Sequence, residues 1–353
     1  MHPYKKLPLD NFWKTGVSDK IYSEINFKDN TKFEIEFDSK IATAGSCFAQ
    51  HIARNLSSLG LQHFITENAP PQITNERATA LQYGVYSARY GNIYTVRQLR
   101  QLIEFAFLLR DRVCIVENTA IGWVDLLRPG VQLEGYESVH DLECDRAFHL
   151  DCVKQIFLEG DYFIFTLGLT EAWHQTRSEI VFPICPGTKL GTFDPTEHSF
   201  INFTYRQVLE DLSWCIHYIK SINPKMKWIF TVSPVALAAT FTSNHVLIAN
   251  TASKAILRAI SDEIYRAYDN CEYFPSYEIT NSPPSFGQFL DSDLRSISAR
   301  GVKLAMNHFK RSFINNKSTG ATKPSLIAPM AQDSIDAAIM AECDEIFNDP
   351  NFR

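Results

Sequence analysis

The sequence lacks a long apolar run, a cysteine pair and an excess of positive charge. None of its apolar stretches approaches the roughly 18–20 residues that a membrane-spanning helix needs. The first residues, MHPYKKLPLDNFW, contain neither the apolar segment nor the small-residue cleavage site of a secretory signal. The net charge is -6, so a nucleic-acid partner is not expected.

The eight cysteines are scattered, and none stands in a CxxC pair. Together with the missing secretion signal, this pattern predicts reduced thiols and a cytoplasmic location. The densest histidine and cysteine group lies in HDLECDRAFHLDC, residues 140–152, and its spacing matches no standard zinc finger or ribbon. The same segment has the apolar spacing of one amphipathic helix, so we predict a helix and no metal site.

What the sequence does have is enough apolar residues for a large core, because 45% of its 353 residues are hydrophobic. Strand–helix alternation with continuously apolar strands is typical of a parallel sheet covered on both faces. The predicted fold is therefore α/β, with ligands bound beyond the carboxyl ends of the strands. We predict strands at 40–44, 61–66, 161–168, 227–235 and 272–279, and helices at 47–59, 205–221 and 246–268.

The long gap between the first predicted strands and the strand at 161–168 is too large for a simple crossover. We interpret residues 68–150 as an inserted helical subregion of a single domain that spans residues 1–316. Residues 317–353 are richer in Ser, Thr, Asp, Ala and Pro, which predicts a loosely attached or partly disordered tail.

The stretch IATAGSCFAQH, residues 41–51, has a local pattern suited to a nucleophile. A strand ends at Gly45, which permits a sharp turn, and Ser46 and Cys47 stand where a helix begins. The unpaired N–H groups and the dipole of that helix end favour an oxyanion and a thiolate. His51 lies one helical turn beyond Cys47 and could reach it.

Each of these residues also has a purely structural interpretation. Ser46 could cap the helix, and Cys47 could be a small buried filler. His51 could be an ordinary histidine of the surface or the core. The local pattern leaves both interpretations open.

Several longer stretches resemble one known family. GSCFAQHIARNL resembles the signature of the GSCFA family, which is placed within the SGNH/GDSL hydrolase superfamily. Further stretches similar to that family are HPYKKLP, SARYGNIYTVRQLRQL, TLGLTEAW, TVSPVALAATF, HVLIANTASKAILRA and YFPSYEI. The resemblance covers nearly the whole chain apart from the tail. It implies a three-layer α/β/α sandwich and an enzyme that hydrolyses or transfers acyl esters, often on sugars.

The resemblance also implies which residue attacks. The first block of the superfamily is Gly-Asp-Ser, and its serine is the nucleophile. Laid over Gly45, Ser46 and Cys47, this block places Cys47 at the serine and Ser46 at the aspartate. Cys47 is therefore the first candidate for the nucleophile and Ser46 the second.

The oxyanion and substrate-binding residues follow from two further blocks. The third block, Gly-x-Asn-Asp, corresponds to GLTE, in which Gly168 matches, Thr170 replaces the asparagine and Glu171 replaces the aspartate. A threonine hydroxyl can donate one hydrogen bond, or Thr170 could simply cap a helix. The second block corresponds to Gly91 and Asn92, and the amide of Asn92 could donate to an oxyanion.

The superfamily's last block, Asp-x-x-His, is missing. Asp293 is followed three residues later by Ser296, so the usual base is absent. The candidates that remain for the base are His51, His174 and His245, although His245 could instead be a helix-entry residue bonded to backbone. A cysteine needs less activation than a serine, because some thiolate exists near neutral pH, so the missing block favours the cysteine.

Lys254 and Arg258 lie on one face of the helix predicted at 246–268. They could bind an anionic group such as a phosphate, or they could form a solvated charged face.

Three functions are compatible with these features. The first is an esterase acting on acylated carbohydrate. The second is an acyltransferase that uses a donor such as acetyl-CoA in making a cell-surface polysaccharide, which a cytoplasmic location favours. The third is a non-catalytic binding or assembly protein on a degenerate hydrolase fold. We expect a small-molecule or carbohydrate substrate and no required cofactor, and the sequence does not predict the oligomeric state.

Overall fold

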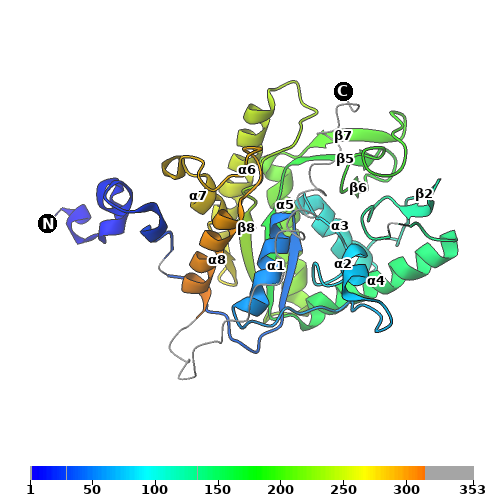
Figure 1. Ribbon diagram of the computed structural model, residues 1–353, viewed down its shortest axis with the longest axis horizontal. Coiled ribbons are helices and arrows are strands. Elements are labelled where there is room, and N and C mark those ends of the chain that lie inside the picture. The colour runs from blue at the N-terminus through cyan, green and yellow to red at the C-terminus, as the bar shows by residue number, and fades with distance from the viewer. Residues whose placement is uncertain (1, 29, 133, 315–353) are drawn as a thin grey trace.

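The protein is described by a computed structural model that covers residues 2–28, 30–132 and 134–314 (Figure 1). Its centre is a four-stranded sheet in the order β1-β4-β8-β9, in which every pair is parallel. The strands are β1 (Ile41–Gly45), β4 (Tyr162–Leu167), β8 (Lys227–Val232) and β9 (Cys271–Tyr273). The predicted α/β class with a parallel sheet is confirmed. The tail predicted at 317–353 lies outside the described residues.

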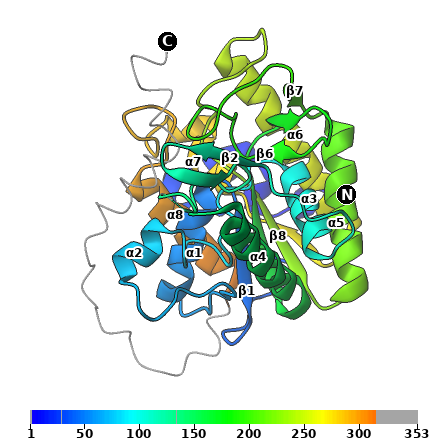
Figure 2. The same ribbon diagram turned by 90° about the vertical axis from the view of Figure 1, so that its right-hand side faces the viewer.

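Helices cover both faces of this sheet, because successive side chains of a strand point to opposite sides. On β4, Phe163 and Phe165 pack into one core, whereas Ile164 packs into another. Figure 2 shows helices on either side with β1 and β8 between them, which confirms the three-layer sandwich. The first core includes α3 (Val96–Ala106), α4 (Val139–Glu159), α5 (Tyr205–Ile222) and α6 (Val246–Ala267), and the second includes α1 (Phe48–Ser58), α7 (Ser276–Asn281) and α8 (Ala299–Phe313).

Two predicted strands are wrong in part. The segment 61–66 forms only a single parallel bridge, between His63 and Ile41. The backbone N–H of Thr66 already donates to Ser87 in the insertion, so the chain leaves the sheet after one bridge. The strand predicted at 272–279 ends at Tyr273, because Pro275 cannot donate to a sheet and stands directly before α7.

The insertion is helical only in part. It contains α2 (Asn75–Ala80), all of α3 and the beginning of α4, as predicted. Between α3 and α4, however, the antiparallel hairpin β2 (Val116–Thr119) and β3 (Gly122–Asp125) interrupts the helical structure.

A second sheet, which the sequence patterns did not predict, follows β4 directly. It consists of β5 (Glu171–Gln175), β6 (Val181–Phe182) and β7 (His198–Asn202), paired antiparallel in the order β6-β5-β7. Because β5 begins a few residues after the carboxyl end of β4, this small sheet forms a wall beyond the edge of the main sheet where ligands are expected.

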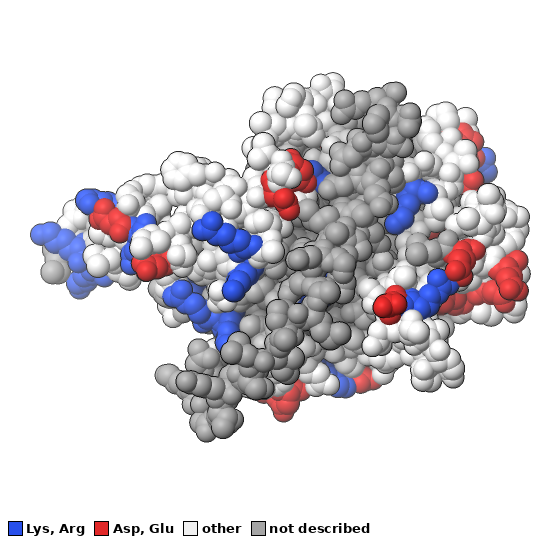
Figure 3. All heavy atoms as spheres, viewed as in Figure 1, with Lys and Arg blue, Asp and Glu red and all other residues white. Residues whose placement is uncertain are grey.

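The N-terminal residues 2–20 form a short arm that projects from the body of the protein (Figure 1). Tyr4, Leu9 and Trp13 are exposed on it. The arm carries charges of both signs on its surface (Figure 3), including an ion pair of 2.7 Å between Lys14 Nζ and Asp19 Oδ2. None of the helices in the described ranges is long and apolar enough to cross a membrane.

Candidate active site

The junction of β1 and α1 is built around Gly45. Its φ of +137° is one that residues with a side chain rarely adopt, and a Cβ there would lie 2.4 Å from the carbonyl oxygen of Thr166. Only glycine therefore lets β1 turn this closely against β4. The next two residues, Ser46 and Cys47, are delivered to the carboxyl end of the sheet, as the sequence predicted.

Cys47 is the N-cap residue of α1, and its side chain makes no capping hydrogen bond. The thiol is 7% exposed and lines a cavity. Ser46 is 2% exposed, lines the same cavity, and its buried Oγ has no hydrogen-bond partner among the described residues. The interpretation of Ser46 as a helix cap is therefore wrong, because Cys47 occupies that position.

The cavity has a volume of about 880 Å³. It opens beyond the carboxyl ends of three strands, since its lining includes Cys47 after β1, Gly168 after β4 and Ser233 after β8. This is the location that the parallel sheet predicts for a ligand. The opposite wall is largely aromatic and comes mainly from the second sheet and its loops, through Trp173, Phe182, Phe193, Phe200 and Phe241.

Close packing at Gly168 ties β4 to the nucleophile loop. A Cβ at Gly168 would lie 2.8 Å from the carbonyl oxygen of Tyr94 and 3.2 Å from the Cβ of Ser46. The carbonyl oxygen of Gly168 accepts a hydrogen bond of 2.7 Å from Lys254 Nζ. Gly168 thus joins the loop after β1, the strand β4 and the helix α6 at one end of the cavity.

Lys254 does not belong to a solvated charged face, because it is only 3% exposed and lines the cavity. Burial lowers its pKa to about 7; the negative charge of Cys47 acts against this shift, and the positive charge of Arg295 adds to it. Arg258, one turn further along α6, points elsewhere and pairs with Glu278. The helical spacing that placed both residues on one face did not separate these two environments.

The three histidines proposed as bases lie outside the lining of the cavity. His245 is exposed and caps α6, where its Nδ1 accepts a hydrogen bond of 3.2 Å from the backbone N–H of Leu247. His174 lies on β5, with Nδ1 3.2 Å from the carbonyl oxygen of the next residue. His51 is half-buried on α1, and its ring packs on Phe48 with 5.8 Å between the centroids.

The proposed oxyanion and substrate-binding residues divide into two groups. Gly91, Asn92, Gly168 and Glu171 line the cavity, whereas Thr170 does not. The Thr170 hydroxyl donates to Asn202 Oδ1 at 2.7 Å, which directs it into the junction of β5 and β7.

Asn92 is held in a defined orientation. Its Oδ1 accepts hydrogen bonds from the Tyr86 hydroxyl and, at 3.5 Å, from Gln50 Nε2. With the oxygen held by two donors, the amide N–H groups of Asn92 are the part of this side chain suited to donate to a ligand. Glu171, in contrast, accepts from the Thr240 hydroxyl at 2.7 Å and holds the loop that carries Phe241.

The segment that replaces the Asp-x-x-His block is a tight turn. The carboxylate of Asp293 accepts hydrogen bonds from the backbone N–H groups of Arg295 and Ser296, and from the Ser296 hydroxyl at 2.6 Å. Ser296, three residues after Asp293, thus donates to that aspartate. Arg295 lines the cavity.

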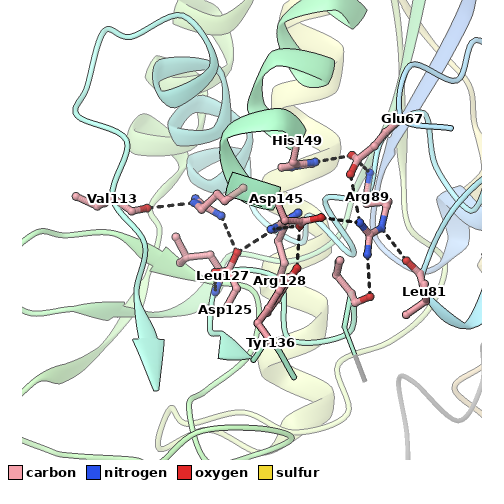
Figure 4. Close-up of polar contacts among 12 residues, drawn as sticks. Glu67, Leu81, Arg89, Val113, Asp125, Leu127, Arg128, Tyr136, Asp145 and His149 are labelled. Atoms are coloured by element: carbon pink, nitrogen blue, oxygen red, sulfur yellow. Dashed lines mark hydrogen bonds and ion pairs between the residues drawn. The ribbon is translucent and has the colours of Figure 1, made fainter. Parts of the chain in front are cut away.

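A buried network of ion pairs supports the wall of the cavity at Arg128 (Figure 4). Arg128 lines the cavity, and its guanidinium donates to Asp125 at 2.9 Å and to Asp145 at 2.8 Å. Arg146 donates to Asp125 and Arg89 to Asp145, both at 3.1 Å. The network continues through Glu67, whose Oε2 lies 2.7 Å from Nδ1 of the buried His149.

This network also accounts for the histidine and cysteine group at 140–152. The segment forms α4 as predicted, and His149 is engaged with Glu67 rather than with a cysteine. Burial and the nearby Arg128 lower the pKa of His149. Within the described residues, no group of three or more His, Cys, Asp or Glu side chains is arranged to hold a metal ion.

Comparison with known proteins places the chain in a family. No curated protein sequence matches it. Among solved structures, it is similar to a protein described as a GDSL-like lipase from Parabacteroides merdae, with 14% identity over 80% of this chain and 97% of that chain and a TM-score of 0.30. It is also similar to a carbohydrate esterase family 3 protein from Talaromyces cellulolyticus, with 10% identity over 77% and 94% and a TM-score of 0.29. The model of the GSCFA family matches residues 40–309, so this chain belongs to the GSCFA family.

Proposed function

We propose that this protein is an SGNH-like enzyme that hydrolyses or transfers acyl esters on carbohydrate, with Cys47 as its nucleophile. The observation that carries the proposal is the position of Cys47. It follows β1 at the carboxyl edge of the sheet, begins α1 and lines a cavity of about 880 Å³. A thiol at a helix N-terminus is where the backbone N–H groups and the helix dipole stabilise a thiolate and an oxyanion.

The comparison between the two candidate nucleophiles favours the cysteine. Both Ser46 and Cys47 line the cavity, but Ser46 is 2% exposed and Cys47 is 7% exposed. A thiol also depends less on a strong base than a hydroxyl does. Ser46 remains the second candidate, because its Oγ has no hydrogen-bond partner among the described residues.

The cavity suits an ester with a ring-shaped group. Its volume lies within the roughly 300–1,000 Å³ typical of ligand sites, which is far more than an acetyl group needs. Trp173 and Phe241 pack edge to face at 4.7 Å and offer a rigid apolar wall. Asn92 supplies amide N–H groups that suit an oxyanion donor. These features support a sugar ring or an acyl chain on the aromatic side and the ester group near Cys47.

Hydrolysis of p-nitrophenyl acetate tests the esterase, and release of CoA from acetyl-CoA in the presence of a sugar acceptor tests the transferase. We expect Cys47→Ala to lower kcat/KM by at least ~10³-fold, because the covalent step is lost. Ser46→Ala should lower it far less. The exposed Cys144 provides a matched control, and Cys144→Ala should leave turnover unchanged.

Absence of turnover would favour the alternative function, a non-catalytic binding or assembly protein. If the folded protein turns over neither substrate, and Cys47→Ala and Ser46→Ala bind sugars like the wild type, the cavity is a binding site without acyl chemistry. That result would support a binding or assembly protein on a degenerate hydrolase fold.

A further inference from the structure

The end of the cavity that holds Cys47 contains a buried amine in an unusual setting. Lys254 reaches it from α6, and the hydrogen bond that fixes its Nζ goes to the carbonyl oxygen of Gly168, at 2.7 Å. None of the described carboxylates forms an ion pair with Lys254. A buried ammonium without a carboxylate partner is costly, so the neutral amine is favoured.

A neutral amine in this position can accept a proton. One N–H of the amine donates to Gly168, which orients the group, and its lone pair stays available. The pKa of Lys254 is lowered to about 7, mainly by burial, so both protonation states are populated near neutral pH. A proton carrier works best when its pKa lies near the pH of the reaction.

Lys254 and Cys47 belong to the same place in the cavity. Both line it, and the negative charge of Cys47 is near enough to raise the pKa of Lys254. The contact between Gly168 and Ser46 brings the carbonyl that holds Lys254 against the loop that carries Cys47. None of the three candidate histidines lines this cavity.

We propose that Lys254 is the proton acceptor for Cys47, in the role that the Asp-x-x-His block fills elsewhere in the superfamily. This inference rests on the proposed acyl chemistry at Cys47. The neutral Nζ takes the proton as the S–H bond breaks, which leaves a thiolate beside an ammonium.

The remaining steps use the same amine to carry two protons in turn. The thiolate attacks the acyl carbon, and a thioester forms as the C–O bond to the alcohol breaks. The ammonium returns its proton to the departing alkoxide. Lys254, neutral again, then takes a proton from water or from an acceptor hydroxyl that attacks the thioester. The products are a carboxylic acid or a new ester, and the restored thiol receives the proton from Lys254.

The test separates proton transfer from turnover. The rate at which iodoacetamide alkylates Cys47 is followed against pH by peptide mass spectrometry, which distinguishes this thiol from the other cysteines. In Lys254→Met, we expect alkylation of Cys47 at pH 7 to slow by at least ~10-fold and its pH midpoint to rise, because only the thiolate reacts. In the same variant, kcat/KM for the ester should fall by ~10²-fold or more.

A second variant distinguishes a proton acceptor from a fixed positive charge. Lys254→Arg keeps a charged donor for Gly168, but a guanidinium does not release its proton in proteins. We therefore expect it to lose ester turnover as Lys254→Met does. Arg266→Met, at an exposed residue of the same helix, is the matched control and should leave both readouts unchanged.

The outcomes distinguish the role of Lys254 from the proposed acyl chemistry at Cys47. An unchanged alkylation profile in folded Lys254→Met would overturn the role of Lys254, and so would full turnover in Lys254→Arg. If the wild type turns over no ester but its alkylation profile depends on Lys254, the proposed function fails while the coupling of Lys254 to Cys47 stands.

Discussion

Two buried charged regions border the same cavity, a network of ion pairs at Arg128 and the single amine of Lys254. Only the network contains equal numbers of positive and negative groups. The network in Figure 4 contains equal numbers of guanidinium and carboxylate groups, each in contact with the next: Arg89, Arg128 and Arg146 against Glu67, Asp125 and Asp145. Lys254, at the other end, faces a backbone carbonyl and no carboxylate among the described residues.

The difference shows how burial acts on paired and unpaired ions. In the network, the surrounding arginines hold the pKa values of Asp125 and Asp145 below their usual range despite burial. These groups therefore stay charged and keep a fixed geometry. The amine of Lys254 has no carboxylate partner among the described residues, and burial lowers its pKa to about 7. We interpret the first region as the rigid support of the cavity wall at Arg128, and the second as the region that exchanges protons.

The largest effect on stability is expected from a substitution in the network of ion pairs in Figure 4. Asp125→Asn keeps the shape of the side chain but leaves Arg128 and Arg146 without their shared carboxylate. We expect the free energy of unfolding to fall by roughly 3–5 kcal/mol, because the change leaves the buried Arg146 without a carboxylate partner among the described residues and Arg128 with Asp145 alone. Urea denaturation measures this. Asp19→Asn, in the exposed pair with Lys14, is the control and should cost less than about 1 kcal/mol. A loss for Asp125→Asn as small as that of the control would contradict the comparison.

The next effect is a gain in stability that depends on pH, and it is expected from substitution of Lys254. The pKa of Lys254 in the folded protein is about 7, below the roughly 10.4 of a lysine in an unfolded chain. Between these values the unfolded chain holds more protons, so this group makes the free energy of unfolding rise with pH from about 7 to about 10. Lys254→Met removes the buried charge.

We expect the stability of Lys254→Met to exceed that of the wild type by roughly 3 kcal/mol at pH 6, even though its hydrogen bond to Gly168 is lost. The advantage should shrink toward zero as the pH approaches 10. Urea denaturation at both pH values measures it. An equal difference at pH 6 and pH 10 would mean that Lys254 is not an uncompensated buried amine.

The smallest effect concerns a histidine outside both regions. His245→Ala removes the side-chain cap on the N–H of Leu247 at the start of α6. The expected cost is about 1 kcal/mol of stability, as for other N-caps, with kcat/KM for the ester within about twofold of the wild type. Activity and urea denaturation on the same preparation check both. A loss of activity similar to that of Lys254→Met would return His245 to the list of candidate bases.

Sequence patterns were sufficient for the centre of the fold. Continuous apolar runs predicted β1, β4 and β8, because these strands are buried on both faces. Helical periodicity predicted α1, α5 and α6, because each helix buries one face. Patterns failed at the small sheet of residues 171–202. Its strands β5 (EAWHQ) and β7 (HSFIN) are as long as β1 but mix polar and apolar residues without a continuous apolar run, and β6 has only two residues.

The site shows the same limit of sequence patterns, because its aromatic wall was not predicted and Lys254 was a candidate for binding an anion, not for accepting a proton. Trp173 and Phe200 come together through the pairing of β5 with β7, which no local pattern indicated. Lys254 did carry a signal, because it lies on the buried stripe of α6 that continues through Leu257 and Ile260. A lysine on an apolar stripe is either paired or perturbed, and only its surroundings decide which.

The sequence by itself determined the layers of this protein, the glycine turn after β1 and the presence of Ser46 and Cys47 at its end. Hydrophobic periodicity and glycine conformation are local properties, so they can be read from neighbouring residues. Only the tertiary structure decided which side chains share the cavity. It left the candidate histidines outside the cavity's lining and brought Lys254 from α6 to the carbonyl of Gly168 beside the nucleophile loop. Burial and distance between remote segments set these relations, and both exist only once the chain has packed.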